Sequence, residues 1–269
     1  MSACPVCDGL NTDRPARIGA FQVQVCADCG LWFFDPAQAR TVDYDEVYRT
    51  PEYEEHHLEA LYRTKDWLAF ANYPTYRPFF DRLRDARGAL LDVGCGVGRF
   101  CRAAYAKGWQ VRGIDVSRTA IEAGRKDAPF PLAVMPIEEL AAGGEKFDVV
   151  TSFEVLEHLS EPKKFVGHIR RALKPGGRFF CTVPNVDSPS VRSATRQDWV
   201  PPVHVLFFNQ RALREMLQRA GLTDVETGEI WVNTPPRGLL RQLKHGVLRL
   251  LGRIGRPEPL GLWAIASVP

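Results

Sequence analysis

Between residues 90 and 100 the chain reads Leu90-Leu91-Asp92-Val93-Gly94-Cys95-Gly96-Val97-Gly98-Arg99-Phe100. The apolar start of this segment predicts a buried strand, and the residues behind the glycines predict a helix. Glycine permits positive φ angles and lets a ligand approach the backbone, because it has no Cβ. The segment therefore predicts a strand, a tight turn and a helix that form a nucleotide cradle.

A carboxylate ends the next predicted strand, in Gly113-Ile114-Asp115-Val116-Ser117. At the carboxyl end of a second strand, Asp115 is placed to accept hydrogen bonds from both hydroxyls of a ribose. The dinucleotide fingerprint is G-x-G-x-x-G, whose third glycine belongs to a pyrophosphate site. Here the spacing is G-x-G-x-G and Arg99 stands where that third glycine would be, so a ribose without pyrophosphate fits better.

The glycine segment resembles the first motif of class I S-adenosylmethionine (SAM) dependent methyltransferases, and three later segments follow in that family's order. They are Phe147-Asp148-Val149-Val150 with Glu154-Val155-Leu156-Glu157-His158, then Leu173-Lys174-Pro175-Gly176-Gly177, then Thr182-Val183-Pro184-Asn185. The resemblance implies an α/β fold with a doubly wound, mostly parallel, Rossmann-like sheet of seven strands whose last strand is antiparallel. It also implies SAM as the cofactor.

The resemblance implies roles for individual residues of the cofactor site. The glycine turn would lie against the methionine part of SAM, Asp92 would orient the turn and the cofactor's amino group, and Asp115 would hold the ribose. Many relatives carry an aspartate for the adenine amino group where this chain has Pro136, so adenine recognition is expected from the backbone at Ile137 and from apolar contacts. The expected cofactor-binding set is Asp92, Gly94, Cys95, Gly96, Gly98, Asp115, Val116, Ile137, Phe153 and Glu154.

Short apolar runs and helical segments alternate from residue 89 onward, which by itself predicts a parallel sheet with helices on both faces. Strands are expected at 89–93, 110–116, 132–135, 147–153, 178–183, 225–232 and 260–268, and helices include 98–107, 118–126, 163–173 and 209–220. Ligands of such sheets bind at the carboxyl ends of the strands.

Four of the seven cysteines form two C-x-x-C pairs, Cys4 with Cys7 and Cys26 with Cys29, separated by 18 residues. This spacing is typical of zinc sites. Four thiolates around Zn²⁺ make a closed, structural site, and metal binding would stabilise a segment too short for a core of its own. A redox pair or unrelated buried thiols are the alternatives; the other three cysteines are expected to be core residues.

The predicted division is a zinc ribbon at 1–36, a tyrosine-rich connector with N-terminal helices at 37–88, and a methyltransferase core at 89–269. This order resembles bacterial methyltransferases of polysaccharide, lipid and natural-product pathways. The core carries a basic amphipathic insertion at 236–257. Within it, residues 237–256 predict a helix that either contacts anionic lipid or nucleic acid, or packs on the core with a solvated basic face.

A base should lie within hydrogen-bond reach of an acceptor that loses a proton. His158 is the first candidate because it follows the fourth predicted core strand, and His204 is the second; for each, a structural histidine is the alternative. The polar segment 186–208, with Arg192, Arg196 and Trp199, is expected to form the acceptor pocket.

The leading functional hypothesis is a SAM-dependent methyltransferase acting on the oxygen or nitrogen of a small molecule that is sugar-containing, lipid-linked or a natural-product intermediate. An RNA or protein methyltransferase that uses the ribbon for recognition is the first alternative, and a non-catalytic SAM-binding scaffold the second. The formal charge of +3 does not argue for nucleic acid, so no nucleic-acid partner is expected. Without an apolar run of membrane-spanning length or a leader, a cytoplasmic location is expected.

Overall fold

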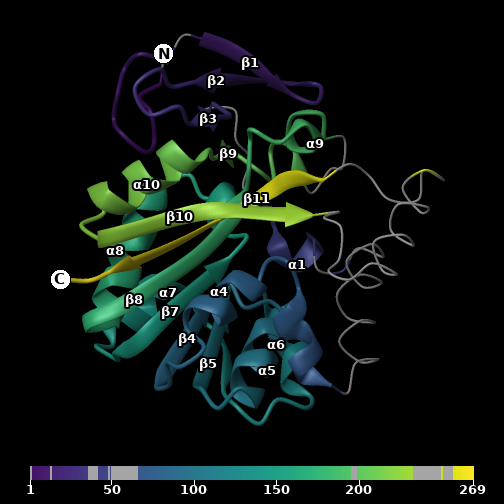
Figure 1. The fold of residues 1–269 in the computed structure, drawn as a ribbon, viewed down its shortest axis with the longest axis vertical. Helices are drawn as coiled ribbons and strands as arrows, with labels where there is room; N and C mark the ends of the chain where they lie inside the picture. The colour runs from purple at the N-terminus through teal and green to yellow at the C-terminus, as the bar shows by residue number, and fades with distance from the viewer. Residues whose placement is uncertain are drawn as a thin grey trace.

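The computed structural model describes residues 2–12, 14–35, 42–47, 49, 66–194, 199–232, 250 and 257–269. Its centre is a seven-stranded sheet (Figure 1). In sheet order the strands are β10 (Thr223–Val232), β11 (Glu258–Ser267), β8 (Leu173–Pro184), β7 (Phe147–Phe153), β4 (Ala89–Val93), β5 (Gln110–Asp115) and β6 (Leu132–Val134). β11 pairs antiparallel with both of its neighbours, β10 and β8, and the other neighbouring strands of this sheet are parallel. The predicted fold class is therefore confirmed.

Helices cover both faces of this sheet, because the strands are apolar on both sides. Within β4, Leu90 packs into a cluster with α4 (Arg77–Arg82), α5 (Arg99–Ala106) and α6 (Arg118–Arg125). Its neighbour Leu91 packs on the opposite face, into a cluster with α7 (Ile137–Ala142), α8 (Pro162–Ala172) and α10 (Gln210–Arg219). Successive side chains of a strand point to opposite faces, so these two adjacent leucines anchor the two helix layers.

The helix starts follow from residues at their N-terminal boundaries. Ser117 caps α6 by accepting a hydrogen bond from the Ala120 amide. Asn209 caps α10 in the same way through the Ala212 amide, at 2.8 Å. Both caps satisfy amides that have no partner inside the helix.

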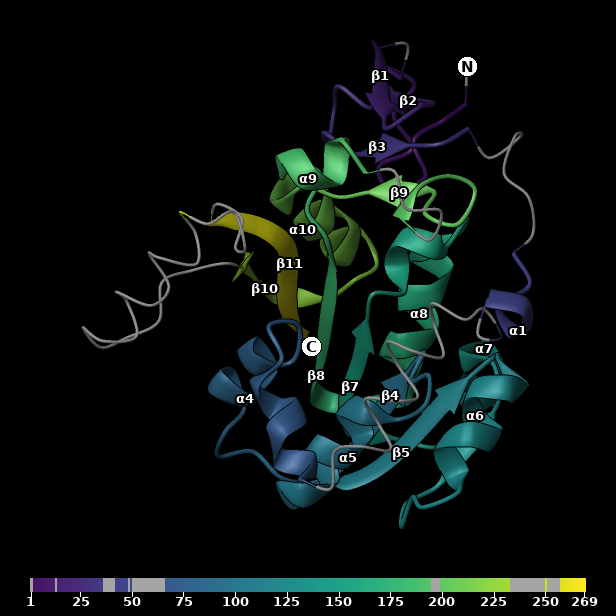
Figure 2. The same cartoon turned by 90° about the vertical axis from the view of Figure 1, so that its right-hand side faces the viewer.

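A second, four-stranded sheet lies at the N-terminal end of the molecule (Figure 2). Its order is β1 (Arg14–Ile18), β2 (Phe21–Val25), β3 (Trp32–Phe33) and β9 (Leu206–Phe207). The first three strands belong to the predicted ribbon, whereas β9 comes from the segment expected to form the acceptor pocket. Neither β1 nor β9 was predicted from the sequence.

Several predicted features lie outside the described residues. They include nearly all of the basic segment 237–256, residues 37–41, 48 and 50–65 of the connector, and Arg196. The described parts of the connector contain α1 (Tyr44–Val47) and the 3₁₀ helix η2 (Trp67–Asn72). Among the helices that the structure describes, none combines the length and apolarity that crossing a bilayer requires.

Candidate functional site

The turn after β4 has the conformation that its glycines predict. Gly94, Gly96 and Gly98 have φ angles of +76°, +53° and +78°. The amides of Gly94 and Cys95 both donate to the Ile114 carbonyl oxygen, at 2.9 and 3.1 Å. The turn is thereby attached to the end of β5, where Asp115 lies.

Asp115 connects the two halves of the cradle. Its carboxylate accepts hydrogen bonds from the Gly96 amide, at 2.8 Å, and from the Ser117 amide, at 2.9 Å. Burial raises the pKa of Asp115, and the two amides oppose that shift. A carboxylate offers about four acceptor positions, so two such bonds leave capacity for ribose hydroxyls.

Asp92 lies below the turn and is almost fully buried. It accepts hydrogen bonds from the Thr151 hydroxyl at 2.8 Å and, more weakly, from the Cys101 thiol at 3.5 Å. Burial raises the pKa of Asp92 from its ordinary value near 3.8 to about 7, against the effect of those two donors. The carboxyl is therefore available as a partner for a cationic ligand group, which would favour its ionised form.

This raised pKa predicts a pH-dependent stability. Between pH 3.8 and about 7 the unfolded chain releases a proton from Asp92 that the folded protein retains, so stability should fall as the pH rises through this interval. Across this interval the free energy of unfolding of the wild type should fall by about 2–4 kcal/mol, and that of Asp92→Asn should not show this fall. Urea unfolding of the ligand-free protein at several pH values measures it; parallel profiles for wild type and variant would contradict the shift.

Gly94 also packs closely against the segment that follows β7. A Cβ at Gly94 would lie 2.4 Å from the Val155 Cγ2 atom, which is shorter than any real contact. The cradle and the segment 154–158 are thus held in direct contact. Only glycine satisfies both the positive φ and this approach.

Replacing Gly94 by alanine should destabilise the protein by about 2–4 kcal/mol, from the steric overlap together with the left-handed backbone. Gly144 is a matched control, because it has the same φ of +76° but no atom within 4 Å of an added Cβ. Gly144→Ala should cost only about 1 kcal/mol. Denaturant unfolding compares the two, and equal losses would show that the Val155 contact is unimportant.

The segment after β7 presents a carboxylate at the sheet edge. Glu154 has a left-handed φ of +55°, and its Oε1 atom accepts a hydrogen bond from the Thr182 hydroxyl at 2.7 Å. The residue is exposed, yet surrounding protein desolvates its carboxyl and raises the pKa to about 7.

Glu157, His158 and His204 form a cluster beside Glu154. One ligand atom of each, a carboxylate oxygen or a ring nitrogen, lies within 4.8 Å of the others. The His158 and His204 rings meet edge to face with centroids 4.7 Å apart. The fold therefore brings the two predicted histidines together. They come from distant parts of the chain: Val203, the residue before His204, lies 45 positions after His158.

The histidines of this cluster have defined surroundings. The Nδ1 atom of His158 donates a hydrogen bond to the Val203 carbonyl oxygen at 2.9 Å. His204 is 6% exposed, and burial, followed by the charge of His158, holds its pKa well below the usual range. His204 is consequently a neutral imidazole at neutral pH.

Glu157 is a functional candidate that was not among the predicted site residues. Its side chain is 0% exposed, and neither carboxylate oxygen has a hydrogen-bond partner in the part of the chain that the structure describes. Burial, and then the charge of Glu154, raise its pKa well above the usual range. The acidic pair Glu154 and Glu157, three positions apart before a histidine, was the signal available in the sequence.

The connector segment α1 lies against this edge, beside α6 (Figure 2). The Tyr44 ring is edge-on to His158, with centroids 5.7 Å apart. Burial raises the pKa of Tyr44, and the charges of Glu157 and Asp115 add to this. Tyr44 therefore lies near both the cradle and the acid–histidine cluster.

Asp45 attaches α1 to the cradle. Its Oδ1 atom accepts from the Ser117 hydroxyl at 2.6 Å and from the Thr119 amide at 3.0 Å. The Ser117 hydrogen bond lowers the pKa of Asp45. Ser117 thus joins Asp45 to the helix that follows Asp115.

The other expected cofactor residues have varied surroundings. Val116 is 57% exposed at the end of β5. Ile137 buries its side chain in the core and supplies the first residue of α7, whose first amides have no partner inside the helix. Phe153 packs against Phe100, with centroids 4.4 Å apart, and Cys95 is buried. Their contacts with SAM stay predictions.

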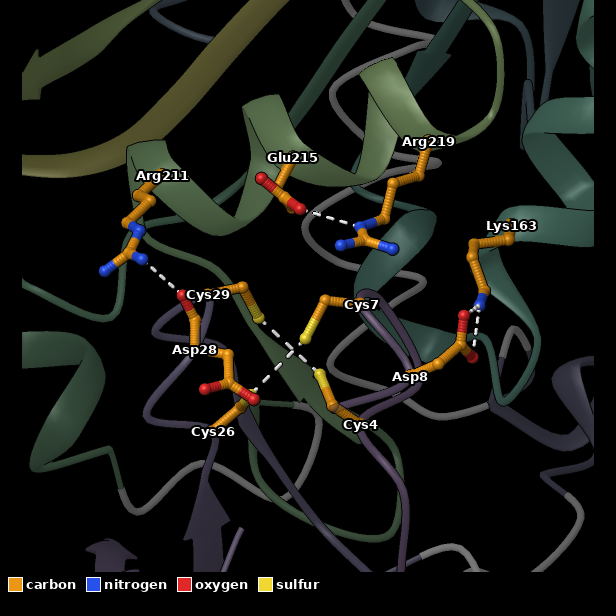
Figure 3. A network of polar contacts seen from close by, with 10 residues as sticks. All are labelled: Cys4, Cys7, Asp8, Cys26, Asp28, Cys29, Lys163, Arg211, Glu215 and Arg219. Carbon is orange, nitrogen blue, oxygen red and sulfur yellow. Dashed lines mark hydrogen bonds and ion pairs between the residues drawn. The ribbon is translucent and has the colours of Figure 1, made fainter. Parts of the chain in front are cut away.

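The four predicted zinc ligands converge in the ribbon (Figure 3). The Sγ atoms of Cys4 and Cys29 are 3.5 Å apart, as are those of Cys7 and Cys26, and all four residues are buried. A zinc ion with Zn–S bonds of about 2.3 Å requires sulfur separations of about 3.8 Å. The contact with Cys29 lowers the pKa of Cys4 to about 5 and raises that of Cys29. The donor set fits a structural Zn²⁺.

The ribbon is joined directly to the acid–histidine cluster. Trp32 and Phe33 of β3 pair with Phe207 and Leu206 of β9. The Phe34 amide donates to the Val205 carbonyl oxygen, at 2.8 Å. The Val205 amide in turn donates to the Glu157 carbonyl oxygen, also at 2.8 Å.

Side-chain contacts with two helices also hold the ribbon in place (Figure 3). Asp8 forms an ion pair with Lys163 of α8 at 2.5 Å, and Arg211 of α10 donates to the Asp28 carbonyl oxygen. The segment that carries His204 is thus fixed between the ribbon and the core.

A seven-stranded sheet with one reversed strand, a glycine turn and a buried carboxylate, Asp115, at its carboxyl edge are the arrangement of a SAM-dependent methyltransferase. The family model described as "Methyltransferase domain" matches residues 60–227, and the chain belongs to this family.

Individual relatives agree with that assignment. The chain is 31% identical over 183 residues to a ubiquinone biosynthesis O-methyltransferase of Idiomarina loihiensis, covering 63% of this chain and 75% of that protein. Coverage of the curated relatives ranges from 44% to 75% of their length.

Solved structures share the fold at low sequence identity. A SAM-dependent methyltransferase from Archaeoglobus fulgidus aligns with a TM-score of 0.55 at 20% identity, over 78% of this chain and 97% of that one. The plantazolicin methyltransferase BpumL in complex with SAH aligns with a TM-score of 0.54 at 15% identity, over 82% of this chain and 92% of that one.

Proposed function

We propose that the protein transfers the SAM methyl group to an oxygen of a small-molecule acceptor, and that the acceptor binds beside Glu157, His158 and His204. The observation that carries this proposal is the location of the cluster. It follows β7 directly, Val155 contacts the glycine turn, and Tyr44 lies near both Asp115 and Glu157. The relatives named as ubiquinone biosynthesis O-methyltransferases support oxygen as the methylated atom.

Direct displacement at a sulfonium requires alignment of the nucleophile, the methyl carbon and sulfur, and no covalent enzyme intermediate. In this proposal the cradle holds SAM through the glycine backbone, Asp115 and Asp92, while Tyr44 helps to exclude water. The acid–histidine cluster promotes removal of the acceptor's proton. A sugar-containing, lipid-linked or natural-product intermediate is the proposed acceptor class, and the four cysteines are proposed to bind structural zinc.

Replacing His158 or His204 by glutamine should lower kcat about 10²- to 10³-fold, because loss of proton transfer typically has this effect. SAM affinity should change by less than about threefold, since neither histidine belongs to the cradle. The exposed His168 of α8 is the matched control and its glutamine variant should retain wild-type rates. Product formation is followed with cell extract as the acceptor source and isotope-labelled SAM. Wild-type turnover by both site variants would remove the histidines from the mechanism.

A further inference from the structure

The glycine turn packs against a buried arginine of α5. Arg102 is 0% exposed and is the bulkiest of the fully buried side chains that the structure describes. A guanidinium group in the interior is strongly disfavoured unless its N–H groups are hydrogen-bonded and its charge is neutralised. The partners of Arg102 therefore show which part of the fold compensates for its burial.

Two of these partners belong to the glycine turn. The Nη1 group of Arg102 donates to the carbonyl oxygens of Val97 and Gly98, at 2.7 and 3.2 Å. Its Nη2 group donates to the Gly124 carbonyl oxygen at 2.8 Å and forms an ion pair with Asp127. Hydrogen bonds from a charged donor are stronger than those from a neutral one. Arg102 thus links the end of the turn to the last turn of α6.

Two glycines leave room for this arrangement. A Cβ at Gly98 would lie 3.1 Å from the Arg102 Nη1 atom, and a Cβ at Gly124 would lie 2.7 Å from the Val97 carbonyl oxygen. Gly124 is helical, so its backbone conformation does not require glycine. The close approach of α6 to the turn is what requires it.

The guanidinium of Arg102 is shielded from solvent. Its Cζ atom lies 5.6 Å from the centroid of the Trp67 ring, within the range of a cation–π contact. Both terminal nitrogens have partners, and only Nε lacks one in the part of the chain that the structure describes. The hydrogen bonds of Arg102 are therefore directed at backbone carbonyl groups and at Asp127.

We propose that Arg102 is a positioning residue of the SAM site, which fixes the glycine turn in the shape that binds the cofactor. The carbonyl and the N–H of a trans peptide unit point in opposite directions. Because Arg102 binds the Val97 carbonyl oxygen, the N–H of that peptide unit, which belongs to Gly98, points the other way. It donates to the Cys95 carbonyl oxygen at 2.9 Å and closes the turn.

The role of Arg102 in cofactor binding rests on the proposed function, which places SAM in the cradle. Lysine keeps the positive charge but is a single point donor, and it cannot reproduce the planar fork that reaches the turn and α6 together. Arg102→Lys should therefore raise the Kd of SAM and its KM about tenfold or more. At saturating SAM, kcat should change by less than about twofold, because Arg102 does not touch the acid–histidine cluster.

Two control variants separate positioning from a general loss of stability. Arg214 of α10 is a half-buried arginine that donates to the Val225 carbonyl oxygen and to the Thr227 hydroxyl, outside the cradle. Arg214→Lys should lower the Tm but leave the Kd of SAM within about twofold. Asp127→Asn removes the counter-charge and leaves the contacts with the turn, so it should behave in the same way.

Isothermal titration calorimetry with SAM measures the Kd of each full-length variant, well below the Tm found by thermal unfolding. Gly124→Ala is the second test variant, which applies equally if Arg102→Lys does not fold. Its Cβ would displace the Val97 carbonyl oxygen while the arginine remains, so the Kd of SAM should again rise with kcat nearly unchanged.

An unchanged Kd in folded Arg102→Lys or in Gly124→Ala would overturn the proposed role. So would an equal loss of affinity in Arg214→Lys or Asp127→Asn, because stability would then explain the effect. If Asp115→Asn also left the Kd unchanged, SAM would bind outside the cradle and the proposed function would fail as well. If Asp115→Asn alone weakened binding, only the role of Arg102 would be wrong.

Discussion

Asp115→Asn should abolish useful binding of SAM, raising its Kd about 100-fold or more. The carboxylate accepts from two backbone amides, and hydrogen bonds to a charged group contribute about 1.5–3 kcal/mol each. Asparagine has only one acceptor oxygen, so its NH₂ group would face the N–H of either Gly96 or Ser117. Two hydrogen-bond donors would then point at each other, and that amide would lose its hydrogen bond. The variant should lose the ribose contact and distort the glycine turn at once.

Asp148 provides the matched control for this variant. Its carboxylate also accepts from a backbone amide, that of Ala89 at 2.8 Å, and pairs with Lys174 at 2.9 Å. It lies near the amino end of β7, beside the first residue of β4, and so at the opposite end of these strands from the cradle. Asp148→Asn should therefore lower stability but leave the Kd of SAM within about twofold, a change of under about 0.5 kcal/mol. Isothermal titration calorimetry measures both; an unchanged Kd in Asp115→Asn would show that Asp115 does not bind the cofactor.

The second large effect is expected from loss of the ribbon's metal. Cys26→Ser should remove the bound zinc and lower kcat about 100-fold or more, because a misplaced catalytic group commonly costs this much. The reason is the continuous connection from β3 through β9 and Val205 to the backbone of Glu157. SAM affinity should be nearly unchanged, because the cradle is built from β4 and β5.

Zinc content by mass spectrometry, SAM affinity and turnover together test this prediction. Wild type stripped of zinc and then reloaded is the control, since it should lose and regain activity while Cys26→Ser should not recover. Equal turnover with and without zinc would mean that the ribbon does not support the site. Loss of SAM binding as well would mean that the ribbon stabilises the whole core.

The core sheet was predictable because its signals are local. The expected strands 89–93 and 147–153 match β4 and β7 residue for residue, since each is rich in apolar and β-branched residues and has a clear end. The helix caps at Ser117 and Asn209 depend on residues three positions apart. The glycine turn and the four cysteines are likewise patterns of residue type and spacing.

The strand β9 was not predicted because it depends on a partner that is distant in the sequence. The strand β9 is only two residues long, too short to show an alternation of apolar and polar side chains. It exists because Phe207 and Leu206 find the edge of β3, more than 170 positions earlier in the chain. The two histidines were separate candidates for the same reason, since no spacing rule connects them. Glu157 was not predicted as a site residue, because its burial and its lack of hydrogen-bond partners among the described residues are properties of the packed structure.

The sequence by itself determined the class of fold, the cofactor cradle and the cysteine cluster, because each depends on residues close together in the chain. The packed fold was needed to show that the ribbon pairs with β9 next to the acid–histidine cluster, and that Tyr44 lies against His158 of that cluster. Contacts between distant segments form through burial and strand pairing, which depend on the whole packed core. The acid–histidine cluster is therefore a property of the fold, whereas the glycine cradle can be recognised from the sequence of residues 90–100 alone.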